Sequence, residues 1–240
     1  MLTWISSEDP ADAFPDAAAA LEAPNGLLAA GGDLSTPRLI AAYTRGIFPW
    51  YEEGQPVLWW SPDPRAVLFP DELKISRSLR RTLKRESFVL STDTAFEEVV
   101  AACAEPRART VETWITREMS SAYQQLHECG FAHSVEVRKD DHLIGGLYGV
   151  AIGLVFFGES MFSRTTDASK VALVALVRKL KQLKYALIDC QVVSAHLQSL
   201  GCRTLARDTF LKQLDEHCKP SVRGCWDDTD WQPSDVVSMV

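Results

Sequence analysis

The sequence lacks the features that mark membrane and secreted proteins. It contains no run of about 18 apolar residues, which a membrane-spanning helix would require. Its opening segment, MLTWISSEDPADAFPD, contains no basic residue, so we expect no secretory signal. The 6 cysteines include no CxxC pair and no regular spacing, which fits free thiols in a reducing compartment. We therefore expect a cytoplasmic protein without a membrane span.

Common catalytic and cofactor motifs are absent as well. The chain has no GxSxG, HExxH or GxGxxG pattern and no Walker A loop. Its histidines and cysteines lack the spacing of a zinc site, as is clear for His196, Cys202, His217, Cys218 and Cys225. No cysteine has an obvious base partner. We expect no metal site.

Acidic residues outnumber basic ones in this chain. With 32 Asp and Glu against 25 Lys and Arg, the formal net charge of −7 argues against a nonspecific nucleic-acid coat. One segment departs from this balance, because residues 74–86, KISRSLRRTLKRE, hold six basic residues before their first acid. Arg77, Arg81 and Lys84 fall at i, i+4 and i+7 and share one face of a predicted helix. We favour a contact with nucleic-acid phosphates, and a solvated helix face is the alternative.

A glycine-rich apolar stretch lies beyond the middle of the chain. Residues 145–164, GGLYGVAIGLVFFGESMFSR, predict two strands, Ile144–Val150 and Leu154–Gly158, joined at 151–153. Glycine weakens a strand, so several in one hairpin indicate that something packs closely against the backbone. The second strand ends in a single acid, Glu159, whose burial would be costly without a partner. The stretch is either a central hairpin with an edge acid or a pocket wall with a charged group at its mouth.

A second segment carries polar residues in an apolar setting. YALIDCQVV, residues 185–193, reads as a central strand on which Asp189 and Gln191 alternate onto the same face. Together with Glu159, they are three polar groups that could converge in one apolar sheet. This convergence is the strongest indication of a site in the chain, and a hydrogen-bonded core network is the alternative.

The order of predicted elements indicates an α+β protein with two domains. Residues 1–62 predict a small N-terminal α+β domain that is rich in prolines and aromatic residues. Residues 63–240 predict a larger domain, with a soft boundary near Ser61–Pro64. From 88 to 206 the predicted order is β-α-α-β-β-β-α-β-α-β, a mixed pattern. Its strand–helix–strand–helix end is similar to the C-terminal half of GNAT-type acyltransferases, so we expect a GNAT-like mixed α/β domain with a C-terminal tail.

Seven sequence blocks carry a resemblance to one enzyme family. They are PNGLLAAGGDLS (24–35), YTRGIFPWY (43–51), LWWSPDPRAVL (58–68), TWIT (113–116), FGESMFSR (157–164), ASK (168–170) and LIDCQV (187–192). In this order they closely resemble leucyl/phenylalanyl-tRNA–protein transferases, over about residues 24 to 202. The match is specific, because we know of no other family in which WWSPDPRAVL is followed by FGESMFSR and LIDCQ.

The resemblance implies an enzyme that moves Leu or Phe, and Met more weakly, from aminoacyl-tRNA to the α-amine of proteins that begin with Arg or Lys. Proteins modified in this way are marked for N-end-rule degradation. An aminoacyl ester is already activated, so no cofactor, CoA, ATP or metal is required. The partners would be the 3′ end and acceptor stem of aminoacyl-tRNA and the acceptor protein, and we expect a monomer.

The resemblance also implies roles for particular residues. The catalytic pair maps to Asp189 and Gln191, with Glu159 nearby in the acceptor site. We expect Gln191 to accept a hydrogen bond from the amine, and Asp189 to hold the Gln191 amide from the same strand face. The pocket for the Leu or Phe side chain maps to Trp50, Trp114, Tyr123, Phe156, Met161, Leu173 and Leu176. The tRNA-binding helix maps to Arg77, Arg81, Lys84 and Arg85.

Two other functions stay open from the sequence. The first is a CoA-dependent N-acetyltransferase of GNAT type, although residues 163–170, SRTTDASK, stand where its pyrophosphate loop would be. The second is a tRNA-binding module without catalysis, which the basic helix would support. That reading leaves Asp189, Gln191 and Glu159 unexplained. Binding of acetyl-CoA would favour the first function, and tRNA binding without transfer to any peptide would favour the second.

Overall fold

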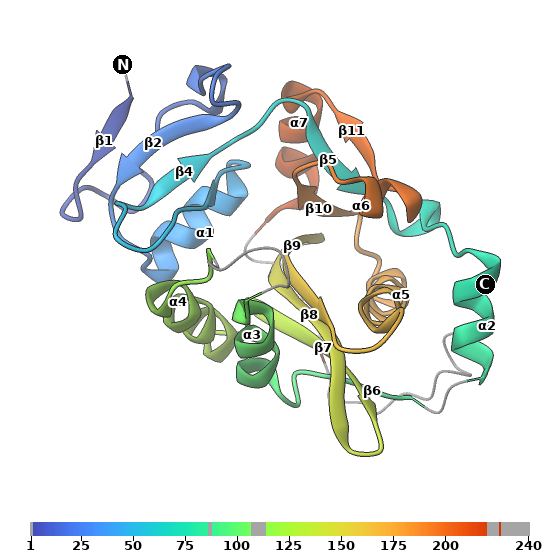
Figure 1. The fold of residues 1–240 in the computed structure, drawn as a ribbon. Helices are drawn as coiled ribbons and strands as arrows, with labels where there is room; N and C mark the ends of the chain where they lie inside the picture. The colour runs from blue at the N-terminus through green and yellow to red at the C-terminus, as the bar shows by residue number, and fades with distance from the viewer. Residues whose placement is uncertain (1, 86–87, 107–113, 220–225, 227–240) are drawn as a thin grey trace.

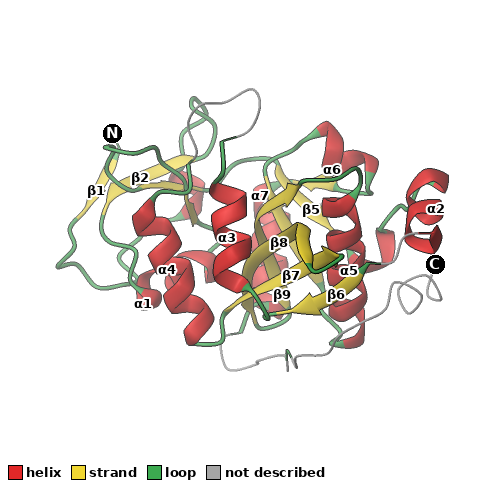
Figure 2. Cartoon of the chain, turned by 60° about the horizontal axis from the view of Figure 1, so that its bottom comes forward, coloured by secondary structure: helices red, strands yellow, loops and turns green. Residues whose placement is uncertain are grey.

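The computed structural model describes residues 2–85, 88–106, 114–219 and 226. It contains two β-sheets with helices packed around them, as Figures 1 and 2 show from two directions. The α+β class predicted from the sequence is therefore confirmed. Among the described helices, none combines the length and the apolar character needed to cross a membrane.

The first sheet is built from the N-terminal part of the chain. Its strand order is β1-β2-β4-β3, with β1 at Thr3–Ile5, β2 at Leu27–Gly31, β3 at Phe48–Pro49 and β4 at Leu58–Trp60. A short 3-10 helix, η1, spans Ala17–Ala19, and helix α1 spans Thr36–Thr44. Of the apolar face Leu39, Ile40, Ala42 and Tyr43 that the sequence predicts for α1, Ile40 is half-buried and the other three are buried.

The second sheet has seven strands in the order β11-β5-β10-β9-β8-β7-β6. The strands are β5 (Arg65–Leu68), β6 (Val89–Thr92), β7 (Ala132–Lys139), β8 (His142–Ile152), β9 (Val155–Ser163), β10 (Leu187–Gln191) and β11 (Arg203–Leu205). Strands β9 and β10 pair in parallel, and the other described neighbours pair antiparallel. The predicted hairpin is confirmed as β8 and β9, both longer than expected. The expectation that the second strand ends at Glu159 is wrong, because β9 continues to Ser163.

Glycines in this hairpin allow the close packing that the sequence predicts. A Cβ atom on Gly145 would lie 2.5 Å from the Cβ of Ala168, at the start of the next helix. A Cβ atom on Gly149 would collide with the carbonyl oxygen of Phe157 on β9. Any side chain at these two positions would push a neighbouring element away, so glycine sets how closely they approach β8.

Helices cover both faces of the larger sheet. Helix α5, Ala168–Gln182, packs on one face against β7, β8 and β9, and helix α3, Phe96–Ala104, packs on the other. Helix α4, Arg117–Glu128, lies beside α3 and contacts α1 of the N-terminal part (Figure 1). One apolar core therefore continues from the α3 and α4 face into the N-terminal part. The predicted boundary between residues 62 and 63 stays a prediction.

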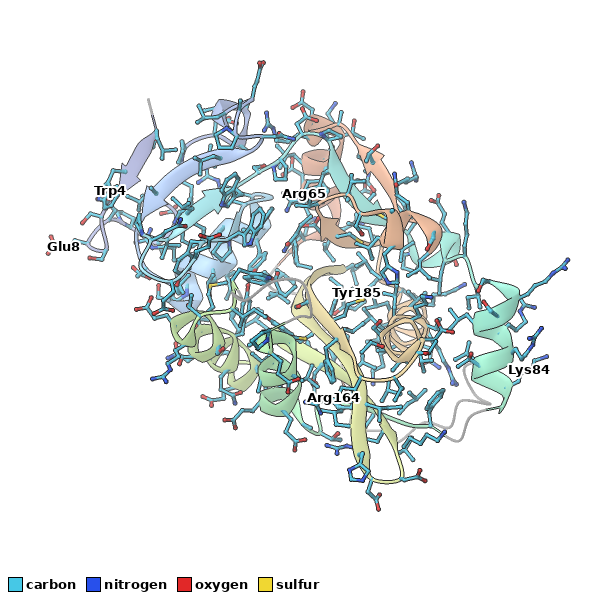
Figure 3. The ribbon with its side chains drawn as sticks, viewed as in Figure 1. Trp4, Glu8, Arg65, Lys84, Arg164 and Tyr185 are labelled. Carbon is cyan, nitrogen blue, oxygen red and sulfur yellow. The ribbon has the colours of Figure 1, made fainter. Side chains whose placement is uncertain are left out.

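The basic segment forms a helix at the edge of the molecule. Helix α2 spans Arg77–Arg85, and its Leu79 and Leu83 are buried in the core that contains α5. Arg77, Arg81 and Lys84 are exposed, and Figure 3 shows Lys84 pointing away from the body of the protein. The predicted helix is confirmed, while its contact with tRNA stays a prediction.

Three further elements complete the fold. They are the 3-10 helix η2 at Pro70–Glu72, helix α6 at Ala195–Ser199 and helix α7 at Arg207–His217. Helix α6 begins directly after β10, and the Ser194 hydroxyl accepts a hydrogen bond from the Leu197 amide at its N-terminus. This cap places α6 beside the end of the strand that carries Asp189 and Gln191.

Candidate active site

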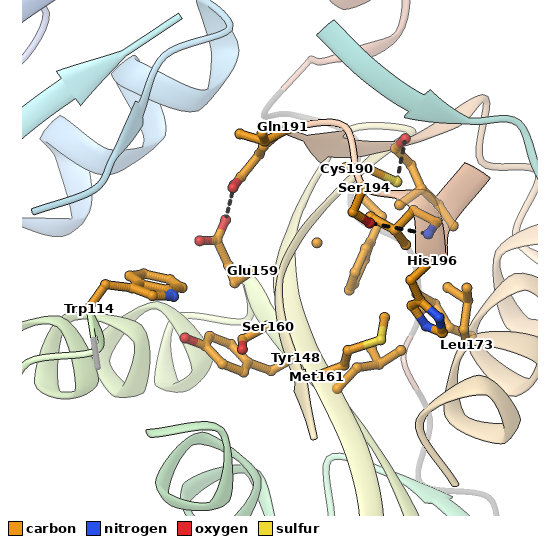
Figure 4. A pocket seen from close by; sticks show the side chains of 17 residues that line it. Trp114, Tyr148, Glu159, Ser160, Met161, Leu173, Cys190, Gln191, Ser194 and His196 are labelled. Carbon is orange, nitrogen blue, oxygen red and sulfur yellow. Dashed lines mark hydrogen bonds between the residues drawn. The ribbon is translucent and has the colours of Figure 1, made fainter. Parts of the chain in front are cut away.

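A cavity of about 520 Å³ lies between the middle of β9, the end of β10 and helix α5. Figure 4 shows Trp114, Glu159 and Gln191 at one end and Met161, Leu173 and His196 at the other. Its apolar lining consists of Trp114, Leu147, Tyr148, Phe156, Met161, Leu173, Leu176, Ile188, Val192 and Leu197. Its polar lining consists of Glu159, Ser160, Cys190, Gln191, Ser194 and His196. Most of the cavity thus suits an apolar side chain, and its polar groups lie mainly in the middle of β9 and at or just beyond the end of β10.

Five of the seven residues predicted for the side-chain pocket line this cavity: Trp114, Phe156, Met161, Leu173 and Leu176. The other two do not. Trp50 belongs to the N-terminal part, outside the cavity, and is 45% exposed. Its ring packs against Trp60, with the ring centroids 5.7 Å apart. Tyr123 is buried behind the cavity wall, where its hydroxyl group donates a hydrogen bond to Glu159. The prediction missed several lining residues, including His196 and Leu197 of α6, because nothing in the sequence places α6 beside α5.

Glu159 accepts three hydrogen bonds at the cavity wall. The Tyr43 hydroxyl donates to Oε1 over 2.8 Å, the Tyr123 hydroxyl to Oε2 over 2.6 Å, and the Gln191 Nε2 to Oε1 over 2.9 Å. Burial raises the pKa of Glu159 to about 7, and the charge of Asp189 adds to this, although the three hydrogen bonds oppose it. The carboxyl group can therefore gain or lose a proton near neutral pH.

The two tyrosines act as fixed donors. Tyr43 and Tyr123 are both fully buried, and their hydroxyl oxygens lie 3.0 Å apart. Burial and the nearby Glu159 carboxylate raise the pKa of both well above the ordinary value for tyrosine. Both hydroxyls therefore stay protonated and keep the Glu159 carboxyl group in one orientation.

The hydrogen-bond partners of Asp189 differ from those that we predicted. It is fully buried, and Arg65 binds both of its oxygens, with Nε to Oδ1 at 2.8 Å and Nη2 to Oδ2 at 2.7 Å. Oδ1 also accepts the backbone N–H of Gln191 over 2.9 Å. The expectation that Asp189 holds the Gln191 side-chain amide is wrong, because that amide donates to Glu159.

The physical reason is an irregularity in β10. The pairing register with β5 shifts between Asp189 and Gln191, and Gln191 has a φ of 61°, in the left-handed region. Such a bulge breaks the alternation of strand faces on which the prediction depended. A non-glycine residue in this conformation costs on the order of 1–3 kcal/mol and persists only where its surroundings hold it. The Asp189 carboxylate and the Glu159 carboxyl group hold Gln191 from its backbone and its side chain.

Sequence reasoning gave no role to Arg65 or Tyr43, although both lie in the quoted blocks. A signal for Arg65 was present. A buried acid in the strand LIDCQ needs a partner, and an arginine that opens the apolar run RAVL is a candidate for it. No comparable signal connects Tyr43 with an acid 116 positions later.

Comparison with known proteins identifies the family. The leucyl/phenylalanyl-tRNA protein transferase family matches residues 67–215, and its N-terminal domain matches residues 32–63. The chain belongs to this family. The leucyl/phenylalanyl-tRNA–protein transferase of Stutzerimonas stutzeri is 56% identical over 217 residues, which cover 90% of this chain and 95% of that protein. The enzyme of the same name from Methylococcus capsulatus is 57% identical, over 92% and 94% of the two chains. The chain is thus an aminoacyltransferase by family.

The solved structures that align with this transferase are more distant from it than these relatives. L-PGS from Bacillus licheniformis aligns over 62% of this chain and 48% of its own, with a TM-score of 0.39 and 10% identity. A GCN5-related N-acetyltransferase from Kribbella flavida aligns over 69% and 59%, with a TM-score of 0.36 and 11% identity. The family assignment does not depend on either structure.

Proposed function

We propose that this transferase moves Leu or Phe from aminoacyl-tRNA to the α-amine of proteins that begin with Arg or Lys. The observation that carries the proposal is a mainly apolar cavity whose described lining includes the acid Glu159, and the pKa of this acid is raised to about 7. The apolar part would hold the Leu or Phe side chain, and the acid would face the acceptor. A new N-terminal Leu or Phe would then mark the acceptor for N-end-rule degradation.

The amino-acid pocket consists of the apolar residues that β9 and α5 contribute. Phe156 and Leu176 are buried, and Met161 is half-buried at the wall. A pocket of this kind distinguishes apolar side chains mainly by size, at about 1–3 kcal/mol per methylene group. Acceptance of Leu and Phe, and of Met more weakly, follows from this modest discrimination.

The chemistry requires little beyond positioning and one proton acceptor. The acceptor amine attacks the ester carbonyl carbon, a C–N bond forms, and the C–O bond to the ribose oxygen breaks. One proton leaves the amine, and one proton must reach the leaving ribose oxygen. We propose that Glu159 takes the first proton and delivers it to the ribose oxygen, because a base with a pKa near the working pH does this most effectively.

Gln191 would orient the amine beside this base. Its Nε2 already donates to Glu159, so the amide oxygen is left to accept a hydrogen bond from the incoming amine. Asp189 is fully buried, and we assign it no contact with either substrate. We infer that it acts through Gln191, whose backbone N–H it holds.

The charges of the two substrates fit different parts of the surface. A side chain or terminus with positive charge at the acceptor end would be attracted by Glu159. The phosphates of tRNA would be attracted by helix α2, where Arg77, Arg81 and Lys84 are exposed, together with Arg85 at its end. We place the reaction in the cytoplasm, because the cysteines that the structure describes are free thiols and suit a reducing compartment, and we propose that the protein acts as a monomer.

Transfer assays with defined acceptors test this function. The protein is incubated with radiolabelled Leu-tRNA and peptides that begin with Arg, Lys or Ala, without CoA. We expect label on the Arg and Lys peptides and little on the Ala peptide. A parallel reaction contains acetyl-CoA in place of the tRNA. Label on none of the peptides, or acetylation in the parallel reaction, would contradict the proposal.

A further inference from the structure

Building on the proposed function, we infer that Arg65 is a positioning residue for the transfer step. Arg65 lies on β5, outside the cavity lining, and touches neither proposed substrate site. It acts on the site through Asp189, which in turn holds Gln191. In this way Arg65 fixes the position of the Gln191 side-chain amide, which would bind the acceptor amine.

The guanidinium group of Arg65 is held by several parts of the chain. Its side chain is 1% exposed, and Nη1 donates to the carbonyl oxygen of Gly46 over 3.1 Å. Its Cζ atom lies 4.7 Å from the ring centroid of Phe48 and 4.8 Å from that of Phe210. Residues of the N-terminal part and of helix α7 therefore fix the guanidinium from both sides. Figure 3 shows Arg65 at this junction.

Arg65 reaches the cavity through two further links. Its bidentate pair with Asp189 leaves Oδ1 in place to accept the backbone N–H of Gln191. That bond holds Gln191 in its left-handed conformation, from which Nε2 donates to Glu159. A planar guanidinium binds both carboxylate oxygens at once, which an ammonium group cannot do.

Arg65→Lys separates position from charge. The lysine keeps one positive charge near Asp189 but loses the two parallel hydrogen bonds, so the carboxylate can rotate and release Gln191. We expect kcat to fall by about 10- to 100-fold, as misplacement by about 1 Å does, with the KM for Phe-tRNA nearly unchanged. Because the Gln191 hydrogen bond lowers the pKa of Glu159, its loss should also move the low-pH limb of the rate profile to higher pH.

The matched control is Arg38→Lys. Arg38 is also 1% exposed, pairs with Asp33 over 3.2 Å and donates to the carbonyl oxygen of Asp9 over 2.9 Å, but it belongs to the N-terminal part. This change should lower stability without altering kcat or the pH profile. Equal effects of the two substitutions on kcat per folded molecule, or an unchanged rate in Arg65→Lys, would overturn the inference.

A double variant separates positioning from stability. Arg65→Met with Asp189→Leu removes both buried charges, and such replacement often preserves folding. We expect cooperative unfolding but transfer reduced as strongly as in Arg65→Lys, because the Gln191 N–H has lost its acceptor. A double variant that transfers at the wild-type rate, or that does not fold, would assign Arg65 to stability and overturn the inference. Failure of the wild-type protein to transfer at all would instead refute the proposed function.

Discussion

Replacing Glu159 with glutamine should make the protein more stable at high pH and much less active. In the folded protein the pKa of the Glu159 carboxyl group is raised to about 7, whereas the ordinary pKa of a glutamate is 4.5. Between these two pH values the folded state binds more protons than the unfolded state. The stability of the wild-type protein therefore falls as pH rises through this window, and glutamine removes the loss.

The size of the effect follows from the pKa difference. One pKa unit corresponds to about 1.36 kcal/mol, so a shift from 4.5 to about 7, on a partly exposed side chain, amounts to about 2 to 3 kcal/mol above pH 7. For a chain of this length that difference corresponds to roughly 4–12 °C in Tm. Gain of stability and loss of activity in one variant is typical of residues retained for chemistry.

The assay is urea denaturation of the wild-type protein and Glu159→Gln at pH 4.5 and at pH 8. The informative quantity is the change in their stability difference between the two pH values, because it cancels any fixed effect of the substitution. We expect glutamine to gain about 2 to 3 kcal/mol in that comparison. A stability difference that stays constant with pH would refute the reasoning about Glu159.

Three further predictions test the neighbouring features. Tyr123→Phe removes a hydrogen bond that lowers the pKa of Glu159, so the low-pH limb of the rate profile should move to higher pH. Tyr185→Phe changes a buried tyrosine elsewhere and should leave this limb in place. Changing Arg77 and Arg81 together to Ala should flatten the salt dependence of tRNA binding by up to about two units of log–log slope. A small aminoacyl-adenosine donor should react as before. An unchanged salt dependence of tRNA binding would show that α2 is only a solvated helix face. Leu176→Ala enlarges the cavity and should raise the preference for Phe over Leu by roughly tenfold in kcat/KM, which competition between the two aminoacyl-tRNAs would measure.

Much of the fold follows from local patterns in the sequence. The β8–β9 hairpin and the strand β10 appear where apolar runs and turn residues predict them, and helix α2 appears where the spacing of basic residues predicts it. Strand β5 was not predicted, because prolines at 56, 62, 64 and 70 indicate loops and its four residues are too few to show alternation. Its place at the centre of the catalytic geometry depends on pairing with β10, more than 100 positions away.

The sequence predicts which residues form the candidate site better than it predicts the contacts between them. Glu159, Asp189 and Gln191 do converge, as polar residues in two apolar strands indicate, although Glu159 lies in the middle of β9 and not at its end. Their hydrogen bonds were assigned to the wrong partners, since strict alternation hides the bulge at Gln191. The buried donors of Glu159 come from α1 and α4, and no local pattern connects these helices with β9.

The most direct test of the catalytic centre is single-turnover transfer from Phe-tRNA to a peptide that begins with Arg, across pH 6 to 9. For the wild-type protein we expect a rate that rises with pH through an ionisation near 7, that of Glu159, and through the amine ionisation near 8. Glu159→Gln should react about 10²-fold more slowly and should keep only the amine ionisation. A Glu159→Gln protein with the rate and pH profile of the wild type would contradict the account.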